Sequence, residues 1–147
     1  MQKPKIYLAG PISGLSLTEA TTWRNDVSRR LLRDFNCVSP LRGAEKQPEA
    51  YFNPNGERWS TMKRIVARDH NDVITSDAIL VNFIGAKKYS RGTGMEIAWA
   101  FDRRIPIFMA IDDGNPNWDP FMAEMVPFMD GNIFDAVQTL RLFFNRG

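Results

Sequence analysis

Short apolar runs alternate along this chain with longer segments in which apolar residues recur at every third or fourth position. Four runs are typical of strands: Lys5–Ala9, Asn36–Ser39, Asp77–Phe83 and Ile105–Ile111. The last two of these are apolar enough to be buried on both faces. Strands that alternate with helices form parallel sheets, because each helix returns the chain to the starting end of the next strand. The pattern therefore predicts an α/β fold, with a parallel sheet and helices on both of its faces.

The segments between these runs carry helix signals. Ser16-Leu17-Thr18-Glu19 has the pattern of a capping box, and an apolar stripe follows at helical spacing: Leu17, Ala20, Trp23, Val27 and Leu31. Three further helices are predicted: one from an N-cap at Ser60 to about Ser76, one over Thr93–Arg103 that is apolar nearly all round, and one capped by Asp130 that carries Phe134, Val137 and Leu140 on one face. A short segment, Pro120–Met125, precedes the last helix.

The loops that follow the strands are the expected ligand-binding regions. In parallel sheets, ligands bind beyond the carboxyl ends of the strands, which are followed here by Gly10–Gly14, Gly85–Gly92 and Asp112–Asp119. A longer connection, Leu41–Trp59, has the Gly, Pro, Asn and Glu content of a segment that covers a site. We expect it to form a long loop or lid.

Composition narrows the class of protein. A length of 147 residues suits one domain over residues 1–147, and a net charge of +2 is too small to favour a nucleic-acid polymer as partner. Cys37 is the only cysteine, so no disulfide within the chain is expected. His70 is the only histidine and is expected at the surface, so an ordinary zinc site is not expected either. No signal-peptide pattern or membrane-length apolar run is seen. The expected protein is soluble and cytoplasmic and binds no membrane.

Asp69 interrupts an otherwise apolar helix face. On the helix that starts near Ser60, it falls between Ile65 and Val73. A carboxylate facing a core must be hydrogen-bonded, paired or neutral. Two interpretations stay open: Asp69 bonds to neighbouring backbone amides as a structural residue, or it transfers a proton at the ends of the strands.

Glu96 is a second carboxylate in apolar surroundings. Thr93-Gly94-Met95-Glu96 is itself a capping-box pattern, so Glu96 could serve only to cap its helix. The alternative is functional, because Gly92 and Gly94 permit close approach of a ligand to the first helical turn. A carboxylate at that place can act as a nucleophile at an acetal-like carbon.

Three stretches of the chain together resemble the nucleoside 2-deoxyribosyltransferase family. They are the opening Lys5–Gly14 (KIYLAGPISG), Asp69 with the Ser76-Asp77 pair that follows it, and Ser90–Glu96 (SRGTGME). Order and spacing agree from Lys5 to about Ile111. The resemblance implies a single-domain, flavodoxin-like three-layer fold with a sheet of about five strands, and it implies that no cofactor or metal is needed.

The resemblance also implies roles for the matching residues. Glu96 would attack the anomeric carbon of a 2′-deoxynucleoside, Tyr7 would orient Glu96, and Asp69 would protonate the departing base and later deprotonate the acceptor. The substrate-binding residues would be Gly10, Ile12, Ser13, Gly14, Ser90, Gly92, Gly94 and Met122. The implied partners are a deoxynucleoside or deoxynucleotide, a free nucleobase, and further copies of the chain in a homodimer or higher homo-oligomer.

Two positions depart from the family pattern. Transferases that act on free nucleosides carry an aspartate six residues before the nucleophile, where this chain has Ser90. The related 2′-deoxynucleoside 5′-monophosphate N-hydrolases are similar in carrying a serine there, which contacts the phosphate. The asparagine or serine that family members lend to a neighbouring subunit, shortly before a Met, has no clear match, and Pro120-Phe121-Met122 stands in its place.

The expected activity is therefore deoxyribosyl transfer from a 2′-deoxynucleoside or its 5′-monophosphate to another base. Hydrolysis of the 5′-monophosphate is the first alternative. A glycohydrolase of NAD-like dinucleotides and a non-catalytic nucleotide-binding module are further alternatives. The joint presence of Tyr7, Asp69 and Glu96 counts against the last of these.

Overall fold

The computed structural model describes residues 2–44 and 59–147, with the backbone alone described for residues 59–61. Its elements follow one another along the chain as β1 (Lys5–Ala9), α1 (Leu17–Leu31), β2 (Asn36–Val38), α3 (Trp59–Ile74), β3 (Ala78–Asn82), α4 (Arg91–Asp102), β4 (Ile107–Ala110), α5 (Pro120–Ala123), β5 (Phe128–Asp130) and α6 (Ile133–Phe143). Strands and helices alternate as predicted.

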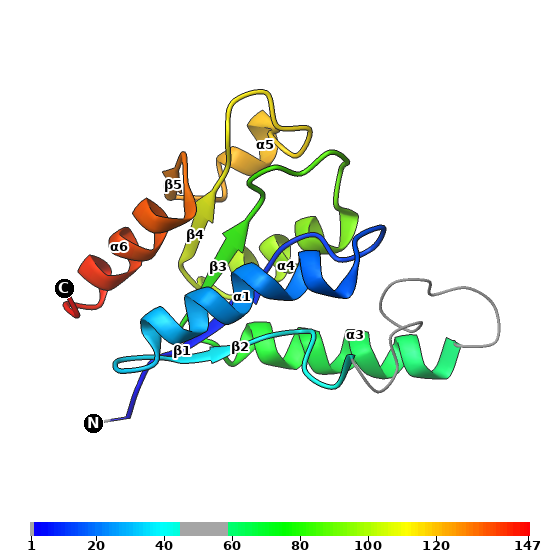
Figure 1. The fold of residues 1–147 in the computed structure, drawn as a ribbon, viewed down its shortest axis with the longest axis horizontal. Coiled ribbons are helices and arrows are strands. Elements are labelled where there is room, and N and C mark those ends of the chain that lie inside the picture. The colour runs from blue at the N-terminus through cyan, green and yellow to red at the C-terminus, as the bar shows by residue number, and fades with distance from the viewer. Residues whose placement is uncertain (1, 45–58) are drawn as a thin grey trace.

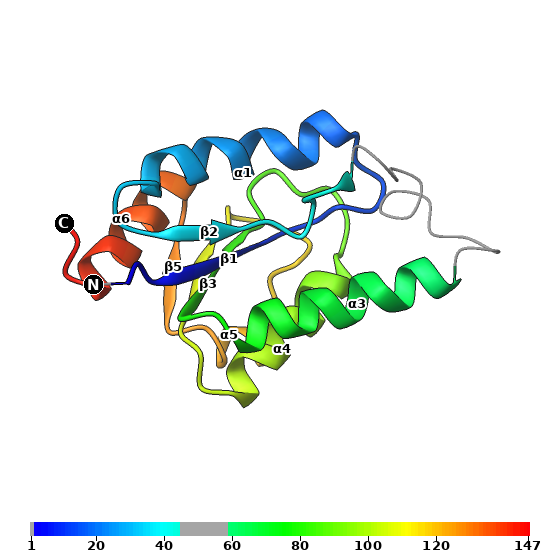
Figure 2. The ribbon, with the colours of Figure 1, turned by 90° about the horizontal axis from the view of Figure 1, so that it is seen from below.

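The strands form one sheet of five parallel strands in the order β2-β1-β3-β4-β5. Helices α1 and α6 cover one face, and α3 and α4 cover the other (Figures 1 and 2). This is the doubly wound, flavodoxin-like arrangement, in which the strand order reverses beside β1. The predicted fold class is confirmed.

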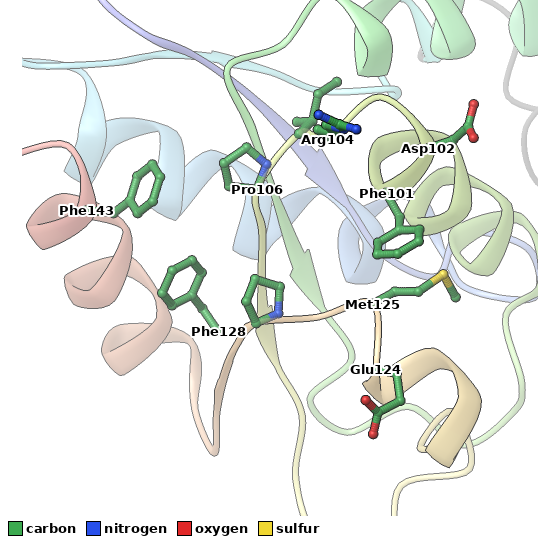
Figure 3. Close-up of a pocket in the computed structure, with 10 residues that line it drawn as sticks. Phe101, Asp102, Arg104, Pro106, Glu124, Met125, Phe128 and Phe143 are labelled. Carbon is green, nitrogen blue, oxygen red and sulfur yellow. The ribbon is translucent and has the colours of Figure 1, made fainter.

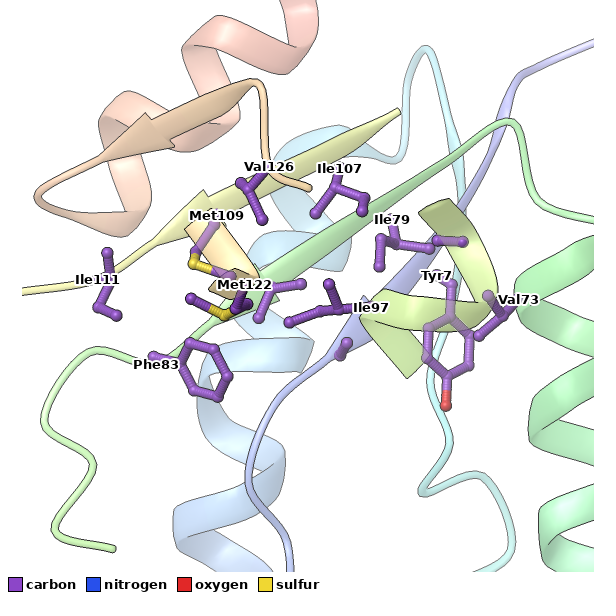
Figure 4. Packing of buried hydrophobic residues seen from close by; sticks show 13 residues of the cluster. Tyr7, Val73, Ile79, Phe83, Ile97, Ile107, Met109, Ile111, Met122 and Val126 are labelled. Carbon is purple, nitrogen blue, oxygen red and sulfur yellow. The ribbon is translucent and has the colours of Figure 1, made fainter. Parts of the chain in front are cut away.

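Alternate residues of the central strands supply two separate cores. Ile6 and Leu8 of β1 pack with Val27 and Leu31 of α1, on the face that also receives α6. Tyr7 of β1 belongs to the opposite cluster, together with Val73 of α3, Ile97 of α4 and Met122 of α5. Figure 4 shows Tyr7 beside Val73 at the margin of this cluster, with its hydroxyl directed away from the aliphatic side chains. A strand thus presents a polar atom at the edge of an apolar layer because its side chains alternate between faces.

The first helix begins as predicted. The Ser16 side chain accepts a hydrogen bond from the Glu19 N–H, and the Glu19 carboxylate accepts one from the Ser16 N–H, at 3.1 and 3.0 Å. Ala20, Val27 and Leu31 of the predicted stripe are buried, whereas Leu17 is exposed. The position between them on the helix face is taken by a buried charged residue, Arg24, which the apolar pattern does not predict.

Other predicted boundaries are wrong. The helix α3 begins at Trp59, so Ser60 lies in its first turn and is not the N-cap. Asp130 ends the short strand β5, and the last helix is capped by the Asn132 side chain, which accepts from the Asp135 N–H. A strand of three residues with its first and last half-buried carries too little apolar signal to be located from sequence.

Several side chains that were predicted to face a core are exposed. They are Phe134 on α6 and, on the helix predicted to be apolar all round, Met95 and Phe101. A helix that rests on one face of a sheet buries a single stripe, so apolar residues outside that stripe stay at the surface.

Of the predicted loop over residues 41–59, residues 45–58 lie outside the described part of the chain. Residues 41–44 form a turn in which Leu41 and Ala44 are buried against Ala20. Among the helices of residues 2–44 and 59–147, none is long and apolar enough to cross a membrane.

Candidate active site

Several of the predicted binding residues lie in the loops that follow the strands: Gly10, Ile12, Ser13 and Gly14 after β1, and Ser90 after β3. The loops after β1, β3 and β4 begin at the same edge of the sheet, and each contains one glycine with positive φ: Gly14 (84°), Gly85 (75°) and Gly114 (72°). At such φ values a Cβ atom is strained, so glycine lets each loop turn tightly as it leaves its strand. The topology thus brings three distant stretches of sequence to one edge.

Tyr7 and Glu96 are in direct contact. The Tyr7 hydroxyl, on β1, donates a hydrogen bond to Oε2 of Glu96, in the second turn of α4. Burial raises the pKa of the Tyr7 phenol far above its ordinary value, and the Glu96 charge raises it further. Tyr7 therefore keeps its proton at neutral pH and acts as a hydrogen-bond donor.

Glu96 does not cap its helix. The residue before α4 is Ser90, the Gly94 N–H donates to the Ser90 carbonyl oxygen, and the Glu96 carboxylate is engaged by Tyr7 instead. The capping interpretation of Glu96 is wrong because the helix starts three residues earlier than the capping-box pattern requires. A carboxylate that is not needed by the backbone is available for chemistry.

Burial dominates the electrostatics of Glu96. It raises the pKa of this carboxyl to about 8, while the hydrogen bond from Tyr7 lowers it, the negative charge of Asp69 raises it and the positive charge of Arg24 lowers it. These four groups come from four different elements, β1, α1, α3 and α4. Of these groups, Tyr7 is in hydrogen-bond contact with Glu96, while the charges of Asp69 and Arg24 act on it through space.

Asp69 is a partly buried carboxyl with a cationic neighbour. Its Oδ1 lies 3.4 Å from both Nε and Nη2 of Arg68. Burial raises the pKa of Asp69 to about 6, and the Arg68 charge limits this rise. The predicted structural alternative was a bond to neighbouring backbone amides, but the contact here is an ion pair, and the raised pKa suits a group that exchanges protons near neutral pH.

Arg68 also fixes the chain that follows β2. Its guanidinium donates to the carbonyl oxygens of Pro40 and, at 3.0 Å, of Arg42. Arg42 in turn pairs with the buried carboxylate of Asp72, 2.5 Å away. This network of charges, which connects α3 to the turn at 40–44, is absent from the sequence predictions because Arg68 points away from the apolar stripe on an ideal helix.

Arg24 is a second residue that sequence analysis missed. It is 1% exposed, and its guanidinium donates to the carbonyl oxygens of Ala20, Gly10 and Leu8, at 2.6, 3.0 and 3.3 Å. Gly10 has no space for a side chain, because a Cβ there would lie 2.9 Å from the Asn82 carbonyl oxygen. The sequence did contain a signal for its burial, because Arg24 is a single charged residue at helical spacing within the apolar stripe from Ala20 to Leu31. The same kind of pattern identified Asp69.

The start of α4 is held by a neighbouring loop. The Ser90 N–H donates to Oδ1 of Asn117 at 2.7 Å, and the Asn117 amide donates to the Lys88 carbonyl oxygen at 3.0 Å. The Ser90 hydroxyl lies 2.8 Å from that of Thr93 and makes no capping bond to the helix backbone. Asn117, buried in the loop after β4, was not predicted and ties the loops after β3 and β4 together.

The remaining predicted binding residues differ in how deeply they are buried. Ser13, Gly14 and Gly92 are exposed in the loop after β1 and at the first turn of α4, where Gly94 is half-buried. Ile12 packs partly against the small cluster of Ala20, Leu41 and Ala44. Met122 is different, because its side chain is buried in the core beneath β4.

A sizeable surface cavity lies elsewhere. It has a volume of about 730 Å³ and is lined by the end of α4, the residues before β4 and the residues around β5, including Phe101, Pro106, Phe128 and Phe143 (Figure 3). Pro106 and Phe128 stand at the amino ends of their strands, so this cavity opens at the edge of the sheet opposite Glu96. Within the described ranges, no group of three His, Cys, Asp or Glu side chains could hold a metal ion.

Comparison with known proteins agrees with this geometry. Residues 3–114 match a family model described as nucleoside 2-deoxyribosyltransferase like. No curated protein matches the chain.

Three solved structures share the fold at low sequence identity. A 2-deoxyribosyltransferase from Bacillus psychrosaccharolyticus has a TM-score of 0.64 and 15% identity, over 90% of each chain. The CMP N-glycosidase BcmB of Clostridium botulinum has a TM-score of 0.55 and 14% identity, over 95% of this chain and 98% of its own. The molybdenum cofactor carrier protein of Chlamydomonas reinhardtii has a TM-score of 0.59 and 14% identity, over 98% of this chain and 99% of its own. At these identities the likeness concerns the fold alone.

Proposed function

The chain belongs to the nucleoside 2-deoxyribosyltransferase-like family, and from that premise we propose that it cleaves the N-glycosidic bond of 2′-deoxynucleosides or their 5′-monophosphates and passes the sugar to another base. The observation that carries the proposal is the Tyr7–Glu96 hydrogen bond, and the negative charge of Asp69 acts on the same carboxyl through space. A nucleophilic carboxylate, a donor that orients it and a second carboxyl that exchanges protons are the groups that retaining glycosyl transfer requires.

The first half of the proposed reaction forms an ester. The Glu96 carboxylate attacks C1′ of the sugar, and the bond between C1′ and the base nitrogen breaks as the electron pair leaves with the base. Asp69, in its protonated form, gives the departing base a proton. The Tyr7 hydroxyl stays bonded to Oε2, so it fixes the plane of the carboxylate while the other oxygen reacts.

The second half reverses these steps with a different base. Asp69 accepts a proton from the incoming base, whose nitrogen attacks C1′, and the ester bond to Glu96 breaks to restore the carboxylate. Two displacements at C1′ return its original configuration. Each proton and electron pair given up in the first half is recovered in the second, so no oxidant or reductant is involved.

A second candidate function is hydrolysis of a 2′-deoxynucleoside 5′-monophosphate, which Ser90 favours. Its hydroxyl stands at the first turn of the twelve-residue helix α4, where the helix dipole stabilises an anion. The neutral serine side chain at this position does not repel a phosphate. The negatively charged aspartate that is expected of transferases acting on free nucleosides would repel it. In this reaction water takes the place of the incoming base.

Product analysis separates these functions. Deoxynucleosides and their 5′-monophosphates are incubated with the protein, with and without a second free base, and the products are separated by chromatography. A new nucleoside or nucleotide that carries the second base supports transfer. Free base with deoxyribose or its 5-phosphate, unchanged by the second base, supports hydrolysis.

The control is Glu96→Gln prepared in the same way, which removes any contaminating activity from the comparison. Absence of products from every substrate, together with measurable nucleotide binding, would contradict the proposal and leave the non-catalytic module. An NAD-like dinucleotide in the same assay tests the remaining alternative.

A further inference from the structure

A network of charged side chains joins α3 to the turn at residues 40–44, and the proposed reaction makes no use of it. Its most buried member is Asp72, whose carboxylate pairs with Arg42 at 2.5 Å and with Lys5 at 3.7 Å. The Arg42 carbonyl oxygen accepts a hydrogen bond from Nη1 of Arg68 at 3.0 Å. Apolar residues of similar size often stabilise a fold as well as buried ion pairs do, so the network points to a role beyond stability.

The guanidinium of Arg68 is the part of this network that reaches the candidate site. It donates to the carbonyl oxygens of Pro40 and Arg42, and its Nε and Nη2 both lie 3.4 Å from Oδ1 of Asp69. A guanidinium is planar and carries its donors in fixed directions, so the carbonyl contacts on one side determine where the other side points. The turn therefore sets the position of the cation that lies against Asp69.

Fastening of the turn does not by itself require this arrangement. The two carbonyl oxygens would also accept hydrogen bonds from a neutral amide. What a guanidinium adds is a permanent charge, and that charge lies against the carboxyl that is proposed to transfer protons, with the Arg68 side chain 30% and the Asp69 side chain 15% exposed. An ion pair that is largely shielded from water acts on its partner more strongly than one at the surface.

Asp69 has to work in both of its protonation states, because it gives a proton to the departing base and takes one from the incoming base. Burial favours the protonated form and raises the pKa of Asp69 to about 6, and the Arg68 charge opposes this rise. Besides Arg68, the groups whose charges interact with Asp69 are Asp72 of α3, Arg42 of the turn, Tyr7 of β1, Glu96 of α4 and Arg24 of α1. Arg68 is the cation in contact with it.

We propose that Arg68 is a positioning residue for Asp69: fixed to the turn at residues 40–44, its guanidinium holds the carboxyl in place and stabilises its ionised form against burial. The inference rests on the proposed function only for the two roles of Asp69. Without Arg68, a larger share of Asp69 would stay protonated at neutral pH, and in that form it can give a proton but cannot accept one. Asp72 and Arg42 serve the same end, because they hold the turn to which Arg68 is anchored.

The test is a direct titration of Asp69. Its carboxyl ¹³C NMR signal, identified by its loss in Asp69→Asn, is followed against pH in the wild type and in Arg68→Gln. Glutamine keeps an amide donor for the turn and removes the charge, so we expect the pKa of Asp69 to rise by about one pH unit. Arg64→Gln is the matched control, because Arg64 is exposed one helical turn earlier on α3, and it should leave the Asp69 pKa unchanged.

The direction of the change separates the proposal from a purely structural role. If Arg68 served only to close the turn, its loss would expose Asp69 to water, and the pKa of Asp69 would fall towards its ordinary value. A fall in this pKa, or no change, in folded Arg68→Gln would overturn the proposal.

A second measurement uses the intact ion pair and does not depend on whether Arg68→Gln folds. The ¹⁵N NMR signal of Nε of Arg68 should shift with pH around the pKa of Asp69, because the contact changes when the carboxyl takes up a proton. Asp69→Asn should abolish this shift. A wild-type signal that does not follow the Asp69 titration, or one that still shifts in Asp69→Asn, would also overturn the proposal.

Turnover supplies a further readout that a structural role would not give. In Arg68→Gln at neutral pH, the first base should still be released, whereas transfer of the sugar to a second base should be slower, because protonated Asp69 cannot accept a proton. Raising the pH by about one unit should restore the transfer. Should product analysis find no activity at all, the proposed function fails, while the two titrations still decide the role of Arg68.

Discussion

The hydroxyl of Tyr7 donates a hydrogen bond to Glu96, 89 residues further along the chain. Tyr7 lies on β1, the second strand from one edge of the sheet, and Glu96 lies on α4, which covers the face towards which Tyr7 points. The bond therefore forms only when this strand and this helix are packed together. It engages Oε2 of the carboxylate and leaves Oε1 without a bond from Tyr7.

Glu96→Gln and Glu96→Ala should lower turnover by several powers of ten, because an amide is a poor nucleophile and alanine has none. Wild-type protein treated with a 2-fluoro-2-deoxyarabinosyl nucleoside should gain the mass of the sugar on the peptide that contains Glu96. Mass spectrometry of the digested protein locates the label. A label on another peptide, or full activity in Glu96→Ala, would remove Glu96 from the mechanism.

Asp69→Asn should lower turnover by about 10²–10⁴-fold while the fold is kept, because the amide has nearly the shape of the acid but cannot donate its proton. Substrates with good leaving groups need less protonation and should be affected least. The measurement is kcat for a series of bases of different acidity. Equal losses for all bases, accompanied by a lower Tm, would instead assign Asp69 a structural role through its ion pair with Arg68.

Stability should depend on pH through Glu96. Its pKa in the folded protein is about 8, against an ordinary value of 4.5, so between these values the folded state holds a proton that the unfolded state has released. Stability is therefore lost as pH rises through this range. Glu96→Gln carries no such proton, and its Tm should exceed that of the wild type by about a few degrees at pH 8.5 and by less at pH 5.

Thermal unfolding followed by circular dichroism at several pH values measures this difference. Asp135→Asn, far from the site at the start of α6, is a suitable control for the loss of a carboxylate. A Tm difference between wild type and Glu96→Gln that is the same at pH 5 and pH 8.5 would contradict the raised pKa of Glu96.

Ser90 should determine whether the protein prefers a deoxynucleoside or its 5′-monophosphate as substrate. If its hydroxyl and the first turn of α4 bind a phosphate, deoxynucleoside 5′-monophosphates should react with a higher kcat/KM than the matching nucleosides. A hydrogen bond to a charged group contributes about 1.5–3 kcal/mol, which is an order of magnitude or more in kcat/KM. Ser90→Asp should reverse the preference, because its carboxylate repels phosphate and accepts a hydrogen bond from a free 5′-hydroxyl.

The measurement is kcat/KM for both substrates in the wild type and in Ser90→Asp. A wild type that prefers the free nucleoside and transfers its sugar to a second base would rule out the phosphate interpretation. Plain transfer between nucleosides would then remain.

The loops at the site edge should associate with a second copy of the chain. Phe121 is 80% exposed and Trp118 53% exposed, an unusual surface for aromatic side chains in a chain that stays monomeric. We expect a dimer or larger homo-oligomer by light scattering at micromolar concentration. Phe121→Ser should shift it towards monomer, whereas Leu142→Ser, an exposed apolar residue at the far end of α6, should not. A wild-type monomer with full activity would contradict this expectation.

The sequence was sufficient for the fold class, and it singled out Asp69 and Glu96 as candidate site residues, because these follow from local patterns. Apolar runs locate β1, β3 and β4, and a carboxylate on an apolar face stands out on a single helix, as Asp69 does. The Tyr7–Glu96 contact follows from the family resemblance rather than from spacing, since nothing local ties two residues so far apart.

The parts that could not be predicted depend on tertiary contacts. Arg24 is buried because β2 stops at Val38 and Pro40 leaves an oxygen without a donor, a condition set by strand pairing. Asn117 is buried because two loops meet, and β5 forms because a neighbouring strand accepts it. Asn117 and β5 have no periodic signal along the chain, and the helical spacing of Arg24 marks its place on α1 without giving the reason for its burial.

Pairing of β1 with β3 has a consequence for how the protein is made. Ile6 lies opposite Ala78, so β1 leaves the ribosome with one edge unpaired and must wait until β3 has been translated. Parallel pairings over such separations form slowly, and an unpaired apolar strand is prone to aggregate during the delay. Nascent chains that stall before β3 should therefore be the forms that chaperones retain, and Tyr7 takes up its place in the sheet only after more than half of the chain has been synthesised.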